Sequence, residues 1–414
     1  MITEQTINNK KIQPKLTFLK AKIENHPLFK DGLEFYLMSE ARVTARTKDQ
    51  LTNLNGKLWV TNLATIVGKN ATGKTTILNA IAGILKLLFY DLSIEQTSLR
   101  NILIGNNPIK ITTFFYGDDE KLYKDEIVFK SKNNGAKKKW IIDSEKIYLK
   151  KFKQQFTKKQ ILNFEGVEPI FDRKELDEVA ATILATNDSI FRVVIAKENY
   201  KTQSIIENII FTNVNAIYYE ESTVPTEILR FLDPTIDYLK VEQQKDEAGE
   251  IKLLYHLKFK NRNEEITATG FDVIQRFLSS GTAKGITLYG NVISALKSGG
   301  IIFVDELENH FNHAIVRSFI EYFSDPKVNV NRATLIFSTH YHELLDDINR
   351  GDEIYITKRK DKIQLQRYSS TEIRNDYKKS EVFESDLLGG TAPEYESYLR
   401  LKKQTKRAVG EKYE

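Results

Sequence analysis

The sequence predicts an α/β fold in which helices cover a mainly parallel sheet, with a mixed or antiparallel sheet beside it. The β-rich run 63–67 leads into a loop with a glycine near each end and then into an amphipathic helix. Residues 271–357 alternate helical and strand patterns, with apolar strand runs at 301–304 and 333–338, as in parallel sheets covered by helices. A separate group of strand-like segments after residue 109 predicts the antiparallel part.

The composition is that of a folded chain. Of 414 residues, 41% are hydrophobic and 28% are charged, which is far from the usage of disordered proteins. The formal charge of +5 is too small to indicate nucleic-acid binding by itself. The absence of cysteine excludes disulfides, thiolate zinc sites and cysteine nucleophiles, and it is compatible with the cytoplasm, where we expect the protein.

The sequence predicts neither secretion nor membrane association. The first residues lack the apolar stretch of a secretion signal. The most apolar segment, 77–90, is interrupted by Asn79 and Lys86 and is shorter than the roughly 20 apolar residues that cross a bilayer. We therefore expect it to form a core helix.

The elements follow in order along the chain. The helix after the glycine-containing loop begins near Lys74, because apolar residues recur at helical spacing. Segments 109–116, 125–132 and 140–142, with a turn at 133–135, predict an antiparallel hairpin sheet.

Two further segments complete the order of elements. Residues 172–222 have a mostly helical pattern, notably at 176–184 and 203–211, and predict an inserted helical lobe. The segments 238–243 and 251–259 predict a second strand pair.

The loop at 68–75 reads Gly-Lys-Asn-Ala-Thr-Gly-Lys-Thr, the spacing of a phosphate-binding P-loop. Its two glycines let successive N–H groups, with the helix N-terminus, face a phosphate. Lys74 then reaches the β- and γ-phosphates of ATP, and the Thr75 hydroxyl coordinates magnesium. The alternative is an ordinary surface turn, which the preceding strand and following helix disfavour. The predicted nucleotide-binding residues are Gly68, Lys69, Asn70, Ala71, Thr72, Gly73, Lys74, Thr75 and Thr76.

The apolar run 301–304 ends in two acidic residues, as a Walker B strand does. We expect Asp305 to hold the magnesium ion. Glu306 is the candidate that orients and deprotonates the attacking water, because hydrolysis needs a second carboxylate. A strand ending in Asp-Glu is by itself often structural, and the P-loop is what makes the pair informative.

Two further motifs resemble those of ABC-type ATPases. Residues Ser279, Ser280, Gly281 and Thr282 resemble the LSGGQ signature, although a polar helix cap is the alternative. His340 follows a Thr at the end of the next buried strand, where its imidazole reaches a γ-phosphate or a water molecule. Asn312 lies where such ATPases carry their D-loop. For His310, His313 and His342 we expect local packing roles.

The order P-loop, signature, Walker B and switch histidine resembles the ABC-ATPase class of SMC, Rad50 and RecF proteins. Within that class, the P-loop, Ser-Ser-Gly-Thr and Asp-Glu-Leu-Glu-Asn resemble the bacterial AAA_15/AAA_21 group of overcoming-lysogenization-like ATPases. Arg374 and Gly-Gly-Thr-Ala-Pro at 389–393 resemble the C-terminal pattern of that group. No residue is assigned as its Q-loop glutamine, because Gln154, Gln155 and Gln160 lie downstream but none lies clearly at a strand end.

The resemblance implies a Mg²⁺-dependent ATPase that is at least a homodimer. Lys74 and Asp305 of one protomer and residues 279–282 of the other would enclose ATP. We expect residues 1–165 and 236–370 to form the ATPase head, 166–235 a helical insertion and 371–414 a C-terminal extension.

The resemblance also implies a function in anti-phage defence, as in abortive-infection AbiL-type or PARIS-type systems. A nucleic acid or phage protein is the implied trigger. The segment after His340 shows no strand-linked acidic cluster, so a Toprim-like or other nuclease effector would act in trans.

Two other functions remain open. One is a DNA-repair or DNA-binding ATPase of RecF or SMC type, in which lysines near Trp140 contact phosphates, although such charge runs are usually solvated. These lysines are Lys137, Lys138, Lys139, Lys150, Lys151, Lys153, Lys158 and Lys159. The other is a transporter cassette, which the long inserted lobe fits poorly.

Overall fold

A computed structural model describes most of the chain. The described residues are 13–134, 137–176, 184–209, 223–245, 249, 251–309, 311, 313–371, 373, 377–385, 387–388 and 395–409. The chain divides into two compact units. Unit 1 consists of Met1–Met38, Asn53–Val60 and Gly83–Gln203, and unit 2 of Ser39–Thr52, Thr61–Ala82 and Ser204–Glu414. The predicted division into head, insertion and extension stays a prediction.

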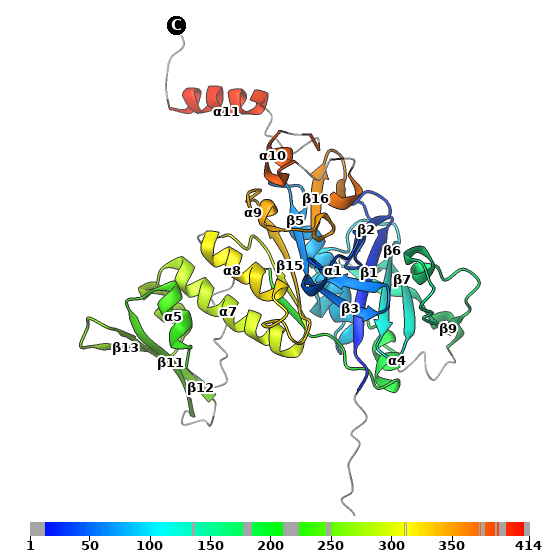
Figure 1. Ribbon diagram of the computed structural model, residues 1–414, viewed down its shortest axis with the longest axis horizontal. Helices are drawn as coiled ribbons and strands as arrows, with labels where there is room; N and C mark the ends of the chain where they lie inside the picture. The colour runs from blue at the N-terminus through cyan, green and yellow to red at the C-terminus, as the bar shows by residue number, and fades with distance from the viewer. Residues whose placement is uncertain are drawn as a thin grey trace, which may run out of the picture. The chain divides into compact units, whose positions relative to one another are not determined.

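Unit 1 contains an antiparallel six-stranded sheet with the order β2-β1-β6-β7-β8-β9 (Figure 1). Its strands are β1 (Leu16–Glu24), β2 (Leu33–Tyr36), β6 (Ile109–Gly117), β7 (Lys121–Asn134), β8 (Lys137–Lys151) and β9 (Pro169–Asp172). Buried aromatic side chains, including Phe18, Phe115 and Phe191, fill its core. Two short helices, α2 (Lys158–Leu162) and α4 (Phe191–Lys197), also belong to it. The predicted antiparallel part is confirmed.

Unit 2 contains a second six-stranded sheet with the order β10-β14-β15-β5-β16-β17. Its strands are β5 (Leu63–Val67), β10 (Ile205–Asn208), β14 (Ile301–Val304), β15 (Thr334–Thr339), β16 (Ile354–Arg359) and β17 (Ile363–Arg367). Every neighbouring pair is parallel except β16 and β17. Strands β5, β14 and β15 are buried along their whole length, which explains why their sequences are uniformly apolar rather than alternating. The predicted parallel core is confirmed.

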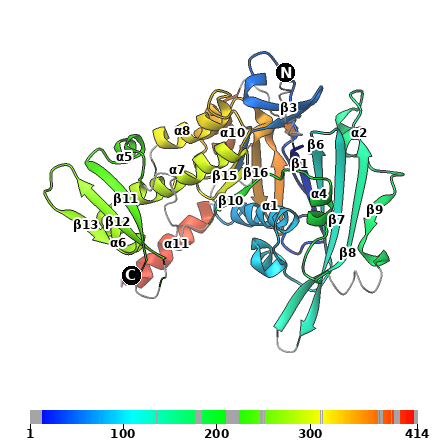
Figure 2. The ribbon, with the colours of Figure 1, turned by 90° about the horizontal axis from the view of Figure 1, so that it is seen from below.

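Helices cover this parallel sheet. Helices α7 (Ser280–Ser298) and α8 (His313–Ser324) bury Val292, Phe319 and Phe323 against the apolar side chains of β5, β14 and β15. Helix α1 (Lys74–Phe89) follows β5 and lies on the other side of the sheet (Figure 2).

Strands β3 (Leu51–Asn55) and β4 (Leu58–Thr61) form a separate hairpin.

A smaller antiparallel sheet precedes helix α7. It consists of β11 (Ile236–Lys245), β12 (Ile251–Phe259) and β13 (Glu265–Ala268). One of its faces packs on α5 (Thr226–Leu232), α6 (Phe271–Ile274) and the start of α7, where it forms a core that includes Leu239, Leu257 and Ile286. In the described part of the chain, the other α-helices are α9 (Leu344–Asp347), α10 (Lys379–Glu384) and α11 (Tyr395–Ala408).

One predicted helix is wrong. Within 203–211, residues Ile205–Asn208 form strand β10, which pairs in parallel with β14 from Ile205 opposite Ile301 to Asn208 opposite Val304. Adjacent apolar residues fit a helix or a strand equally well. Here the segment forms a strand because it pairs with the edge of β14. Much of the other predicted helix, at 176–184, lies outside the described residues. None of the described helices is both long enough and apolar enough to span a bilayer.

Candidate nucleotide-binding site

The P-loop connects β5 to α1, as predicted, and both of its glycines are required by their surroundings. A Cβ atom on Gly68 would lie 2.0 Å from the Thr357 hydroxyl of β16. Gly73 has φ +95°, and a Cβ atom there would lie 2.3 Å from Cδ1 of Ile363 in β17. The loop is therefore held closely against the neighbouring strands and presents its backbone outward.

Lys74 is the first residue of α1, and its ammonium group lies inside the loop. Nζ donates hydrogen bonds to the carbonyl oxygens of Gly68 (2.8 Å) and Lys69 (3.0 Å) and to Nδ1 of His340 (3.2 Å). Burial lowers the pKa of Lys74, and the carboxylates of Asp305, Glu306 and Glu308 oppose that shift. The P-loop and the end of β15 thus meet at this lysine.

The Walker B strand reaches the P-loop through Asp305. Oδ2 of Asp305 accepts a hydrogen bond of 2.6 Å from the Thr75 hydroxyl, and Oδ1 accepts one from the hydroxyl of Ser338. Strands β14 and β15 pair in parallel with Val304 opposite Phe337, so Asp305 and Ser338 come next to each other at the carboxyl edge of the sheet. The two predicted magnesium ligands are therefore neighbours.

Glu306 has an unusual backbone conformation, with φ 48°. A residue other than glycine in this left-handed region is uncommon. Ser338 holds the turn, because its hydroxyl accepts a hydrogen bond of 2.8 Å from the Glu306 N–H and its carbonyl one of 3.1 Å from the Leu307 N–H. The turn directs the Glu306 carboxylate to His340, with 3.0 Å between Oε1 and Nε2. Since Nδ1 of His340 accepts from Lys74, Nε2 carries the proton and donates it to Glu306.

Glu308 is a site residue that was not predicted from the sequence. It is only 6% exposed, and Oε1 accepts a hydrogen bond from the backbone N–H of His340, whereas Oε2 is buried without a partner among the described residues. A buried carboxylate therefore fixes the backbone of His340 and adds negative charge near Lys74. A carboxylate two residues after Glu306 was the only signal in the sequence.

Lys284 of α7 also lies at the site. It lines a hollow of about 110 Å³ together with Asn208, Asp305, Glu306 and Asn309. Burial lowers its pKa, and Glu306 opposes the shift. Helix α7 thus brings a cation to the carboxylate that we expect to act on water, two residues after the predicted signature.

The predicted signature begins helix α7. Ser279 is the N-cap residue, and its hydroxyl accepts a hydrogen bond of 3.0 Å from the Thr282 N–H and lies 2.7 Å from the Thr282 hydroxyl. The helix starts at Ser280, within the predicted signature. The cap that was the alternative interpretation is therefore present, and it leaves a role for Ser280 and Gly281 toward a second protomer open.

Several other predicted residues are placed differently or lie outside the described residues. His313 stacks on Tyr341, and His342 stacks on Phe383 and bonds Glu384, in keeping with packing roles. His310, the predicted D-loop residue Asn312, Arg374 and residues 389–393 lie outside the described part of the chain. In the described part, no three His, Cys, Asp or Glu side chains form a metal-binding group.

Lys150, a predicted phosphate contact, forms its contacts within unit 1. Its Nζ donates to the carbonyl oxygens of Gln160 and Asn163 and lies 4.3 Å from the ring centre of Phe164. Burial and the neighbouring Lys124 lower its pKa to about 8. The ammonium group of Lys150 is therefore occupied by contacts within unit 1, and its role as a phosphate contact stays a prediction.

With this geometry in place, comparison with known proteins gives the family. Residues 63–346 match the model of the family described as AAA domain, putative AbiEii toxin, Type IV TA system. The chain belongs to this AAA_21 family. No curated protein matches it.

Solved structures with similarity include an SMC head bound to the C-terminal winged-helix domain of ScpA, which is 13% identical with a TM-score of 0.39, covering 84% of this chain and 97% of that one. The recombination mediator RecF with bound ATP is 10% identical with a TM-score of 0.38, covering 85% of this chain and 100% of that one.

Proposed function

We propose that this AAA_21 protein is a Mg²⁺-dependent ABC-type ATPase that binds ATP at the P-loop and hydrolyses it with Glu306 and His340. The observation that supports this most directly is the hydrogen bond of 2.6 Å between Thr75 and Asp305, which joins two motifs far apart in the sequence. A hydroxyl and a carboxylate side by side at a helix N-terminus are what a nucleotide-bound magnesium ion requires.

The residues fit a magnesium ion that is bound mainly through phosphate. Thr75 and Asp305 would hold it, and the close contacts of Gly68 with Thr357 and of Gly73 with Ile363 keep the loop against β16 and β17. One carboxylate and one hydroxyl suit Mg²⁺, which keeps water and phosphate ligands rather than an all-protein cage. When bound, the ion neutralises charge on the β- and γ-phosphates.

The other residues of the site bind the phosphates, act on the attacking water or complete the site from a second protomer. Lys74 neutralises phosphate charge, and the N–H groups of Asn70 to Thr76 hydrogen-bond its oxygens. Glu306 orients the attacking water and accepts its proton, and His340 holds the Glu306 carboxylate through Nε2. Residues 279–282 of a second protomer would complete the site, so activity requires at least a homodimer.

Two variants test this proposal. Lys74→Ala should abolish ATP binding, whereas Glu306→Gln should bind ATP but hydrolyse it at least about a hundredfold more slowly, the lower range for loss of a general base. Glu306→Gln should also accumulate as an ATP-bound dimer in light scattering. Lys327→Ala and Glu343→Gln, in exposed positions, are the matched controls. Hydrolysis by Glu306→Gln at the normal rate would refute the assignment.

We further propose that the ATPase is the sensor or scaffold subunit of an anti-phage defence system and controls a separate effector nuclease. Support comes from the family description, which names a putative toxin of a type IV toxin–antitoxin system. The test is a phage challenge of cells carrying the gene with its neighbours. Protection that Lys74→Ala abolishes supports defence, and equal plaque counts with and without the genes would contradict it.

A DNA-binding ATPase of RecF or SMC type is the second candidate, and one feature favours it. Helix α11 carries Arg400, Lys402, Lys403, Lys406 and Arg407 against a single acidic residue. DNA-stimulated hydrolysis that falls steeply with salt, and that Lys402→Glu with Lys403→Glu abolishes, would favour this function. Unchanged hydrolysis with DNA would argue against it.

A further inference from the structure

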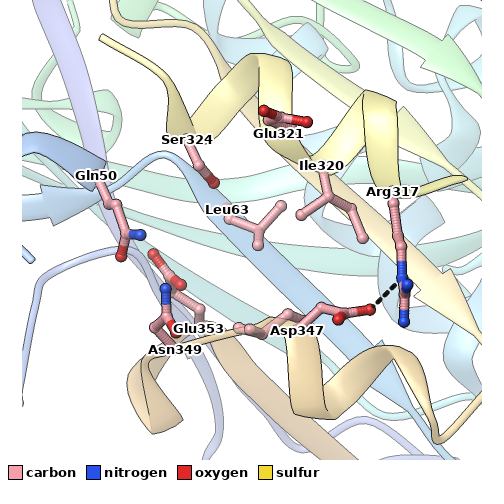
Figure 3. Close-up of a pocket in the computed structure, with 10 residues that line it drawn as sticks. Gln50, Leu63, Arg317, Ile320, Glu321, Ser324, Asp347, Asn349 and Glu353 are labelled. Carbon is pink, nitrogen blue, oxygen red and sulfur yellow. Dashed lines mark hydrogen bonds and ion pairs between the residues drawn. The ribbon is translucent and has the colours of Figure 1, made fainter. Parts of the chain in front are cut away.

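A cavity of about 270 Å³ opens in unit 2 at the amino edge of the parallel sheet (Figure 3). Leu63, the first residue of β5, and Glu353, directly before β16, line it together with α8 and the end of α9. The P-loop follows the opposite end of β5, so the length of that strand separates the cavity from the nucleotide site. The proposed ATPase therefore assigns no role to this cavity.

Glu353 is the unusual residue of the cavity. It is 4% exposed, its carboxyl group forms no hydrogen bond among the described residues, and its oxygens are not among the fully buried unpaired atoms, which places them against the space of the cavity. Its neighbour Asp352 is equally buried, yet its carboxylate accepts hydrogen bonds from Arg350, the Ser39 hydroxyl and the N–H groups of Glu40 and Ala41. A buried polar group without a partner is costly, so the Glu353 carboxyl calls for a hydrogen-bond donor from the cavity.

The lining leaves an excess of acceptors. Arg317 is the basic residue of the wall, and its Nε already donates to Asp347 Oδ2 at 2.7 Å, as the dashed line in Figure 3 shows. Glu321 and Glu353 form no ion pair among the described residues, although the two NH2 groups of Arg317 remain as donors in the wall. Gln50 and Asn349 lie on the same side as Glu353 and offer amide oxygens.

The cavity also has apolar walls, formed by Leu63 and Ile320. At 270 Å³ it is smaller than the roughly 300–1,000 Å³ of clefts that take whole drug-sized ligands. It therefore suits one side chain or a small fragment rather than a nucleotide. A ligand that fits must be cationic, rich in donors and able to pack flat against aliphatic groups.

We propose that this cavity binds a guanidinium group, supplied by an arginine side chain of a protein partner. Guanidinium is planar, carries five N–H donors and no acceptor, and is weakly hydrated enough to pack on apolar side chains. It would donate to Glu353 and Glu321 between Leu63 and Ile320. An ammonium group has the positive charge but lacks the flat faces that pack on Leu63 and Ile320. A carboxylate or phosphate would be repelled by the carboxyl groups of Glu353 and Glu321.

The titration of Glu353 gives the proposal a second signature. Burial and the nearby Asp352 raise its pKa to about 8, while Arg350, Arg367 of β17 and Lys379 of α10 act in the opposite direction. Across the cavity it faces Glu321, Asp347 and Arg317. A bound cation favours the ionised carboxylate, so affinity should rise with pH by up to about tenfold per unit below pH 8.

Isothermal titration of the full-length protein with N-acetyl-L-arginine amide tests the proposal. The uncharged isostere N-acetyl-L-citrulline amide and the ammonium N-acetyl-L-lysine amide are the matched ligands. We expect the arginine compound to bind at least about tenfold more tightly than the other two, and more tightly at pH 8 than at pH 6.5. Comparison of the peptide Gly-Arg-Gly with free agmatine distinguishes a protein side chain from a small guanidine.

Two variants locate the binding. Glu353→Gln keeps the shape and should weaken arginine binding at least about tenfold and remove its pH dependence, whereas Glu343→Gln outside the cavity should have no effect. Ser324→Trp, which fills the cavity, should abolish binding without touching Glu353. Equal binding of arginine and citrulline, no binding of either, or normal binding by both variants would overturn the proposal and leave a cavity that holds water.

Discussion

Ser338 offers the sharpest test of how the nucleotide site is held together. It is fully buried, and its hydroxyl donates to Asp305 while accepting from the N–H of Glu306. In Ser338→Ala the hydrogen bond to an ionised group is lost, worth about 1.5–3 kcal/mol, and a partly buried N–H loses its partner at about 1–3 kcal/mol. Because Glu306 is partly exposed and water can reach its N–H, we expect the free energy of unfolding to fall by about 2–4 kcal/mol.

The same change should act on catalysis. The left-handed conformation of Glu306 costs about 1–3 kcal/mol and persists only while its surroundings hold it. Without the Ser338 hydroxyl the turn should relax and move the carboxylate, lowering kcat about tenfold or more, since each 1.4 kcal/mol is a factor of ten. Urea denaturation and steady-state ATPase assays measure both effects, with Ser370→Ala as the control. Loss of less than about 0.5 kcal/mol together with an unchanged kcat would refute the reasoning.

Three further predictions concern single contacts. Gly73→Ala should unfold at lower urea concentration and lose ATP binding, because Gly73 has φ +95° and a Cβ atom there would collide with Ile363. Gly56→Ala is the control, since Gly56 also has a positive φ but open space around it, and it should lose less stability. Equal losses of stability in the two variants would contradict the steric contribution of Ile363. Glu308→Ala should lower the free energy of unfolding by about 1–3 kcal/mol, because it leaves the His340 N–H without an acceptor. Glu308→Gln keeps an acceptor oxygen and should lower the free energy of unfolding less. Equal urea midpoints for the two variants would contradict this role of the Glu308 carboxylate. The raised pKa of Glu353 stabilises the folded state fully at pH values below the ordinary carboxyl pKa of 4.5. This stabilisation, on the order of a few kcal/mol, is lost as pH rises through about 8. The melting temperature of Glu353→Gln should therefore be higher than that of the wild type at pH 8.5 but not at pH 4.5.

The sequence predicted those parts of the fold that local pattern determines. The runs 63–67, 251–259 and 301–304 agree with β5, β12 and β14 to the residue, because each ends directly before a glycine or a charged residue. Strand β10 was missed because its two isoleucines acquire strand character only from the edge of β14. Local periodicity carries no information about which edge a segment will meet.

The same distinction applies to the site. Gly68, Lys74, Asp305 and Glu306 lie in motifs whose spacing is itself the signal. Thr357, Ile363 and Ser338, by contrast, reach the site only because β16, β17 and β15 take their places in the sheet. Their roles follow from strand order, which no local window of sequence contains.

The contacts of Lys74 indicate how the site would respond to a phosphate. An ammonium group has three N–H donors, and all three are used, toward Gly68, Lys69 and His340. A γ-phosphate that takes one of them should displace the longest, the 3.2 Å contact to His340, because the carbonyl bonds at 2.8 and 3.0 Å belong to the loop itself. His340 would then keep Glu306 as its partner, and its Nδ1 would have to gain a proton to donate a hydrogen bond to the phosphate. Nucleotide binding and the position of the Glu306 carboxylate would thereby be coupled through one imidazole ring.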